Sequence, residues 1–225
     1  GTSYSAPLIA RKLAYLIHIL GFSREEAKAL IIDSCTGWSN INKNVKLTGH
    51  GVVPTRINDI IKTNNDEIKF VISGISEKYD TYNFQLPVPM DKEKYPFVAK
   101  ATMCYFPKCS RTQGVDYTNT EFELKLGRLK FNPKTNEYTI VGINNDVQDI
   151  EGKYTNEEEA RREFRKWDNT KCIREKFNNR VRDKKMYENP LWGISVKTKN
   201  RINQEDGRNL RFGIVITLKE IHGKN

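Results

Sequence analysis

The chain has 225 residues, of which 37% are hydrophobic and 29% charged, a balance typical of a folded globular protein rather than a disordered one. Its apolar runs fall well short of the ~18 residues that a membrane-spanning helix needs, so we expect no membrane partner. The formal net charge of +10 is spread along the chain, which is more typical of a solvated surface than of a basic stripe for nucleic acid.

Four cysteines are scattered along the chain, at positions 35, 104, 109 and 172. They are too few for a disulfide scaffold, and Cys104 and Cys109 have no second pair of cysteines or histidines nearby to complete a zinc site. We therefore expect no metal and no cofactor. Free cysteines favour a reducing compartment such as the cytoplasm, and nothing else in the sequence indicates a location.

Residues 1–64 have the pattern of helices. Between residues 6 and 20, apolar side chains lie almost all the way round a 3.6-residue turn, which predicts a buried helix that ends at Gly21. Ser23 and Glu26 form a capping box at the start of an amphipathic helix that runs to about residue 36. A glycine-flanked turn at residues 49–51 then leads to a short helix at residues 58–61. The apolar residues of the first helix are Leu8, Ile9, Leu13, Leu16, Ile17, Ile19 and Leu20.

From residue 65 onward, apolar residues alternate with polar ones, which is the pattern of strands with one buried face. Several such strands, separated by turn residues, predict an antiparallel β-sandwich over residues 65–225. Thr155 and three glutamates open a stretch that ends in basic residues, so we expect an inserted helix over about residues 155–186. The predicted fold class is α+β. The alternating residues are Tyr82, Phe84, Leu86 and Val88; Phe97, Ala99, Ala101, Met103 and Tyr105; Phe122, Leu124 and Leu126; and Leu210, Phe212, Ile214, Ile216 and Leu218.

The chain begins with the sequence Gly1-Thr2-Ser3-Tyr4-Ser5-Ala6-Pro7, directly before the predicted buried helix. Glycine lets a substrate approach the backbone closely, and a serine at a helix N-terminus lies beside free N–H groups that favour a developing oxyanion. This stretch resembles the nucleophile motif of the subtilisin-like serine peptidases, Gly-Thr-Ser-x-Ala/Ser-x-Pro, and Gly1, Thr2, Ser3, Ser5 and Pro7 match it. Because the chain starts at this motif, we expect it to be the C-terminal part of a longer protein.

The resemblance covers residues 1–63. Subtilases continue with a buried helix, a capped amphipathic helix and a Gly-x-Gly turn, and the turn here is Gly49-His50-Gly51-Val52-Val53. Arg11 and Lys12 stand where many members of the family have small residues, which indicates a divergent branch. The second part resembles the jelly-roll or P-domain-like sandwiches of many subtilases, because an alternating strand from residue 98 ends in an aromatic residue and a proline.

The resemblance implies a serine endopeptidase that forms an acyl-enzyme on Ser3, whose backbone N–H also contributes to the oxyanion hole. In the family the catalytic Asp, the catalytic His and the oxyanion-hole Asn precede this serine, so all three are absent from this chain. His18 lies fifteen residues along the same helix, about 22 Å from Ser3. His50 lies in a turn where the family tolerates many residues, and His222 lies in the C-terminal tail. The isolated chain is therefore expected to be inactive.

Two partners follow from the resemblance, a peptide or protein substrate and the upstream catalytic fragment of the same protein. Without that fragment, we expect the apolar helix at residues 6–20 to fold back on the sandwich or to associate with a second copy. The alternative function is a β-sandwich that binds nucleic acid or an acidic protein partner. Its candidate residues are Tyr105, Phe106, Arg111 and Tyr117, although a strand end followed by a turn is the simpler explanation for them.

Overall fold

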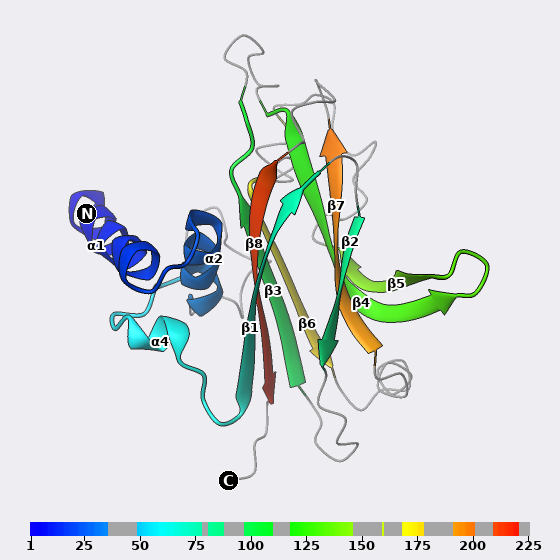
Figure 1. Cartoon of the computed structure of the whole chain (residues 1–225). Coiled ribbons are helices and arrows are strands. Elements are labelled where there is room, and N and C mark those ends of the chain that lie inside the picture. The colour runs from blue at the N-terminus through cyan, green and yellow to red at the C-terminus, as the bar shows by residue number, and fades with distance from the viewer. Residues whose placement is uncertain are drawn as a thin grey trace.

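The structure is a computed structural model that describes residues 1–35, 49–77, 81–87, 97–109, 118–145, 159, 168–177, 191–200 and 209–220 (Figure 1). Within these residues, eight strands form two antiparallel sheets. The strands are β1 (Glu67–Ser76), β2 (Thr81–Pro87), β3 (Phe97–Tyr105), β4 (Thr120–Asn132), β5 (Glu137–Asn145), β6 (Thr170–Phe177), β7 (Leu191–Asn200) and β8 (Leu210–Glu220).

The two sheets face each other as a sandwich (Figure 1). Sheet A has the strand order β1-β8-β3-β6, and sheet B has the order β2-β7-β4-β5. Consecutive strands therefore lie in opposite sheets, except β4 and β5, which pair with each other in sheet B. The first strand, β1, pairs with the last, β8. This is the connectivity of an eight-stranded jelly roll.

The main core fills the space between the sheets with the alternating side chains of both inner faces. At its centre the ring of Phe122 meets Tyr105 at 4.9 Å and Phe212 at 5.3 Å, both edge to face. The strands predicted from alternation, at residues 82–88, 97–105, 122–126 and 210–218, are confirmed as β2, β3, β4 and β8, although Val88 lies outside the described residues.

Helices precede the sandwich. They are α1 (Thr2–Ala14), the π-helix η1 (Tyr15–Ile19), α2 (Arg24–Ser34) and α4 (Asn58–Ile61). Figure 1 shows α2 between the outer face of sheet A and the more distant helices α1 and α4. None of the helices in the described part of the chain is long and apolar enough to cross a membrane.

A second core joins these helices to sheet A. Its buried members are Leu16, Ala27, Ala29, Leu30, Ile31, Ile60, Cys104 and Val215. Cys104 and Val215 point outward from β3 and β8, so β8 is buried on both faces, between the main core and α2. The predicted boundary between residues 64 and 65 therefore runs through a shared hydrophobic cluster.

Helix α2 begins with the capping box expected from the sequence. The Glu26 backbone N–H donates to Ser23 Oγ at 3.2 Å, and the Ser23 N–H donates to the Glu26 carboxylate at 2.7 Å. The same turn lies directly on β8, because a Cβ atom added to Gly213 would be only 2.5 Å from the Glu26 backbone nitrogen. Glycine at position 213 thus permits close contact between helix and strand.

The helix expected over about residues 155–186 is wrong where the structure describes it, because Thr170–Phe177 is strand β6. The alternation of Lys171 and Ile173, both buried, with the half-buried Cys172 and Arg174 is a strand pattern that the flanking charges obscured. Glu159 is helical, and most of the remaining predicted helix lies outside the described residues.

The helix expected at residues 6–20 forms as α1 followed by η1, but it is not buried on all sides. Helix α1 has no fully buried residue, and in η1 only Leu16 is buried. Ile9, Leu13 and Ile17 are partly buried against the second core. The segment therefore packs onto the second core beside α2 and leaves its other face exposed. The fold-back was expected on the sandwich itself, whereas α2 lies between this segment and sheet A.

Candidate functional site

Ser3 lies in the first turn of α1, which starts at Thr2 with Gly1 as its N-cap, and its side chain is exposed. The backbone N–H groups of Tyr4 and Ser5 donate to the Gly1 carbonyl at 3.1 and 3.4 Å, and Ser5 Oγ donates to it at 3.1 Å. Within the described residues, the Ser3 hydroxyl forms no hydrogen bond. The hydroxyl is thus accessible to a reactant.

The start of α1 keeps its positive dipole end, because no acidic residue lies in the first turn. Pro7 lies inside α1 and has no N–H to donate to the carbonyl of Ser3, four residues earlier. Small residues and this proline therefore leave the first turn polar and open, which is compatible with a nucleophile at Ser3.

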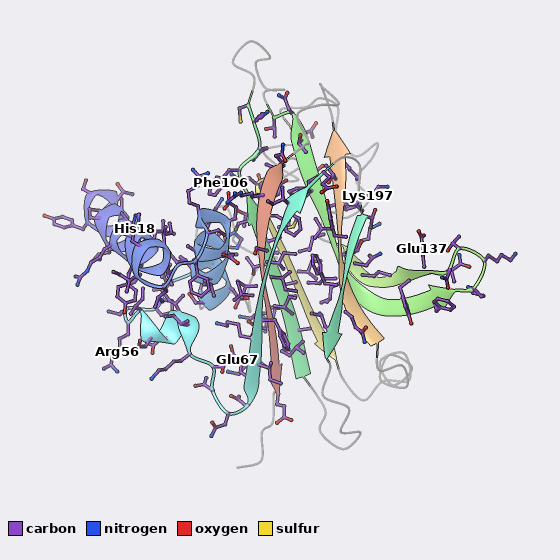
Figure 2. All side chains as sticks on the ribbon, viewed as in Figure 1. His18, Arg56, Glu67, Phe106, Glu137 and Lys197 are labelled. Atoms are coloured by element: carbon purple, nitrogen blue, oxygen red, sulfur yellow. The ribbon has the colours of Figure 1, made fainter. Side chains whose placement is uncertain are left out.

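The structure places no described histidine beside Ser3. His18 is exposed on η1 (Figure 2). It lies fifteen residues along the helical segment from Ser3, which corresponds to about 22 Å of helix. His50 lies in the turn before α4, where its Nδ1 is 3.8 Å from Cys172 Sγ of strand β6. His222 lies outside the described residues. Neither histidine in the described part of the chain is therefore placed to act as a base for Ser3.

One face of α1 and η1 exposes large apolar side chains, and we call it the exposed stripe (Tyr4, Leu8, Tyr15 and Ile19). Their spacing puts them on one side of a helix. Tyr4 is 81% exposed, Leu8 59% and Ile19 67%, far more than apolar side chains in a folded core. A contiguous apolar surface of this kind is typical of a contact with another part of a protein or another chain.

A buried charge cluster that the sequence pattern did not predict lies between α2 and sheet A. The Asp33 carboxylate is fully buried, and it accepts hydrogen bonds from Thr217 Oγ1 at 2.7 Å and Thr102 Oγ1 at 3.4 Å. Lys69 Nζ and Lys100 Nζ lie 3.6 and 3.7 Å from its oxygens. Asp33 is the one acidic residue directly after the apolar run at residues 29–32, and that isolation was the signal available in the sequence.

The two lysines of this cluster also hold the backbone of the helices. Lys100 Nζ donates to the Asp33 carbonyl at 2.9 Å, and Lys69 Nζ donates to the carbonyl of Ile60 in α4 at 3.1 Å. Burial lowers the pKa of Lys100 below its ordinary value, and the Asp33 carboxylate opposes that shift. The cluster thus joins α2, α4 and three strands of sheet A through a single carboxylate.

Helix α1 is attached to this assembly from its other side. Lys12 Nζ donates to the Thr55 carbonyl at 2.9 Å, which joins the last turn of α1 to the segment before α4. Ile9 and Leu13 pack against the second core. Ser3 is therefore carried on a helix whose position depends on α2 and α4, and through them on Asp33.

Of the four aromatic and basic residues proposed to bind nucleic acid, Tyr105 and Phe106 lie in the described part of the chain. Tyr105 is fully buried in the main core, and its hydroxyl donates to the Asp168 carbonyl at 2.8 Å. Phe106 is 41% exposed, with Arg24 and Lys28 above its ring at 5.6 and 5.2 Å. Arg111 and Tyr117 lie outside the described residues. Tyr105 is the last residue of β3 and its ring lies in the core, which agrees with the simpler explanation of a strand end followed by a turn.

The described residues contain no group of three or more His, Cys, Asp or Glu side chains that could hold a metal ion. Their four cysteines are all free thiols. Burial raises the pKa of the Cys104 thiol to about 11 and also raises the pKa of Cys35, so neither is poised for chemistry.

No family model and no curated protein matches this chain. Among solved structures, a mitogen from Yersinia pseudotuberculosis is similar over 70% of this chain and 89% of its own, with 11% identity and a TM-score of 0.26. The tobacco streak virus coat protein is similar over 73% and 94%, with 6% identity and a TM-score of 0.26. The VP1 protein of the trichodysplasia spinulosa-associated polyomavirus is similar over 71% and 97%, with 9% identity and a TM-score of 0.24. These TM-scores are too low to carry an argument about fold or function.

Proposed function

We propose that this chain is the C-terminal part of a subtilisin-like serine endopeptidase in which Ser3 is the nucleophile. One observation carries the proposal. Ser3 stands within the motif Gly1-Thr2-Ser3-Tyr4-Ser5-Ala6-Pro7, and its hydroxyl is exposed in the first turn of a helix. That is the placement a nucleophile at a helix N-terminus requires.

The exposed stripe on α1 and η1 supports the same proposal. In a complete peptidase of this class, the helix that carries the serine packs inside the catalytic domain, so its apolar residues would be covered. Here Leu8 and Ile19 face outward while Ile9 and Leu13 are partly buried. A helix with one face on the second core and one apolar face uncovered is what the proposal predicts for this chain without an upstream catalytic fragment.

The proposed reaction is acyl transfer. Ser3 Oγ attacks the peptide carbonyl, its proton passes to a histidine of the upstream fragment, and the leaving amine takes that proton as the C–N bond breaks. Water then releases the acid from Ser3. The backbone N–H of Ser3 contributes to stabilising the oxyanion, and the jelly roll holds the helices that carry this residue.

The test is active-site labelling of the full-length parent protein with a fluorophosphonate, beside the variants Ser3→Ala and Ser73→Ala. We expect the parent to label and Ser3→Ala not to label, because the hydroxyl is the attacking group. Ser73, an exposed hydroxyl on β1, is the matched control and should leave labelling unchanged.

The isolated chain of residues 1–225 should not label, because an unactivated serine hydroxyl is a weak nucleophile. Wild-type turnover of a peptide substrate by Ser3→Ala would refute the assignment of Ser3. Strong labelling of the isolated chain would show that a base within these residues had been overlooked.

A further inference from the structure

A thiol and an imidazole from distant parts of the sequence meet at the edge of sheet A. Cys172 Sγ, on strand β6, lies 3.8 Å from Nδ1 of His50, in the turn before α4. Both side chains are half-buried, so a small reagent can reach them. A cysteine paired with a histidine is an arrangement that supports nucleophilic thiol chemistry.

The strand register fixes the surroundings of Cys172. It is directly opposite Thr102 of β3, whose hydroxyl bonds to Asp33, so both side chains point to the helix-covered face of sheet A. Ile173 points the other way, into the main core. Cys172 thus lies on the same face of sheet A as the Asp33 cluster.

Basic side chains lie close to Cys172 in the strand register. Arg174 lies two residues further on the same face of β6, and Lys100 is directly opposite Arg174 on β3. His50 adds a proton acceptor from the turn. Asp33, on α2, is an opposing negative charge, and its carboxylate is held by Lys69, Lys100 and two threonine hydroxyls.

We propose that Cys172 is a reactive cysteine that undergoes thiol–disulfide exchange with small disulfides. His50 Nδ1 accepts the thiol proton, and the Cys172 sulfur attacks one sulfur of the disulfide. The old S–S bond breaks as a new one forms, and the leaving thiolate takes up the proton. The proposal does not depend on the assignment of Ser3.

The site also has a structural consequence. His50 belongs to the turn that leads into residues 52–61, and Val53, Ile57 and Ile61 of that segment pack against the second core. A group attached to Cys172 would occupy the space where the imidazole now lies. Exchange at Cys172 therefore displaces the turn from strand β6.

The experiment uses hydroxyethyl disulfide, a small neutral probe, and mass spectrometry that resolves each cysteine. Cys109 is the internal control, because it is exposed and its thiol donates to the Pro107 carbonyl rather than to a base. A histidine that lowers a thiol's pKa by one or two units raises its exchange rate at pH 6 about fivefold, since weaker nucleophilicity offsets part of the gain in thiolate.

We therefore expect Cys172 to react about fivefold faster than Cys109 at pH 6 in the folded chain, and at the same rate in guanidinium. His50→Gln should reduce the Cys172 rate to that of Cys109 and leave Cys109 unchanged. Equal rates in the folded wild type, or an unchanged Cys172 rate in His50→Gln, would overturn the proposal. If His50→Gln does not fold, the comparison of folded and unfolded wild type decides alone.

Discussion

Replacing Asp33 by asparagine should strongly destabilise the fold while keeping the shape of the side chain. Asparagine can still accept the hydrogen bond from Thr217, but it no longer neutralises Lys69 and Lys100. Removing one partner of a buried ion pair typically costs about 3–5 kcal/mol, because the other charge remains buried without compensation. Since the stability of a typical domain is only about 5–15 kcal/mol, the loss would be a large fraction of the whole.

The measurement is urea unfolding of residues 1–225 followed by circular dichroism. We expect the urea concentration at the unfolding midpoint to fall by an amount that corresponds to about 3–5 kcal/mol. The slope of the unfolding free energy against urea concentration should change little. The matched control is Glu123→Gln, because Glu123 also contacts two lysines, Lys125 and Lys199, both at 3.2 Å. These two ion pairs are more exposed than those of Asp33, so Glu123→Gln should lower the free energy of unfolding by at most about 1 kcal/mol.

A second substitution tests the cause of the effect. If the uncompensated lysine charge is responsible, Asp33→Asn combined with Lys100→Met should be more stable than Asp33→Asn alone. An Asp33→Asn variant within about 1 kcal/mol of wild type would refute the reasoning, since a carboxylate of this kind would then contribute no more than a surface pair.

Three further predictions concern other parts of the molecule. The Cys104 pKa is raised from 9.0 to about 11, so the unfolded thiol loses its proton first and stability should fall between pH 9 and 11, by up to about 2–3 kcal/mol. Thermal unfolding across that range should show a smaller fall for Cys104→Ala than for wild type, and equal falls would contradict the prediction. Gly213→Ala should cost about 1–3 kcal/mol in urea unfolding, because the added Cβ meets the Glu26 backbone and α2 must shift, whereas an unchanged midpoint would show that α2 moves freely. Sedimentation of residues 1–225 at rising concentration should show association through the exposed stripe, which Leu8→Lys with Ile19→Lys abolishes; a monomer at all concentrations would show that a second copy does not cover it.

The periodicity of apolar residues predicted those helices and strands that have one buried face and one face exposed to solvent. The alternation in β2, β3 and β8 and the capping box at Ser23 are of this kind, and they form as expected. Strand β6 was not predicted because its buried position 171 is a lysine, a residue type that is normally exposed. In the structure this lysine is buried because it pairs with Glu121. A pattern of residue types cannot recognise a charge that is buried with its partner.

The candidate site was predictable only where it rests on a local motif. Gly1, Ser3 and Pro7 are neighbours in sequence, so the helix start and the exposed serine follow from a few residues. The Asp33 cluster joins residues up to 184 positions apart, from Asp33 to Thr217, and the Cys172–His50 contact spans 122 positions. Contacts of this range depend on the strand order, which sequence periodicity does not specify.

The sandwich at residues 65–225 should fold without the helices, but with reduced stability. All members of the main core lie in the strands, from Phe70 to Leu218, so deletion of residues 1–64 removes none of them. The deletion uncovers Cys104 and Val215, which are fully buried beneath the helical segment in the intact chain. It also removes the acceptor of Thr102 and Thr217, although these hydroxyls and the two lysines can then be hydrated.

We therefore expect residues 65–225 to show one cooperative thermal transition at a lower temperature than residues 1–225. Calorimetry of the two chains under the same conditions measures the difference. Absence of a cooperative transition would mean that the sandwich requires α2 and the Asp33 cluster in order to fold. An equal midpoint would mean that the helices add nothing to the sandwich, which is incompatible with a fully buried carboxylate that binds two strands of sheet A through Thr102 and Thr217.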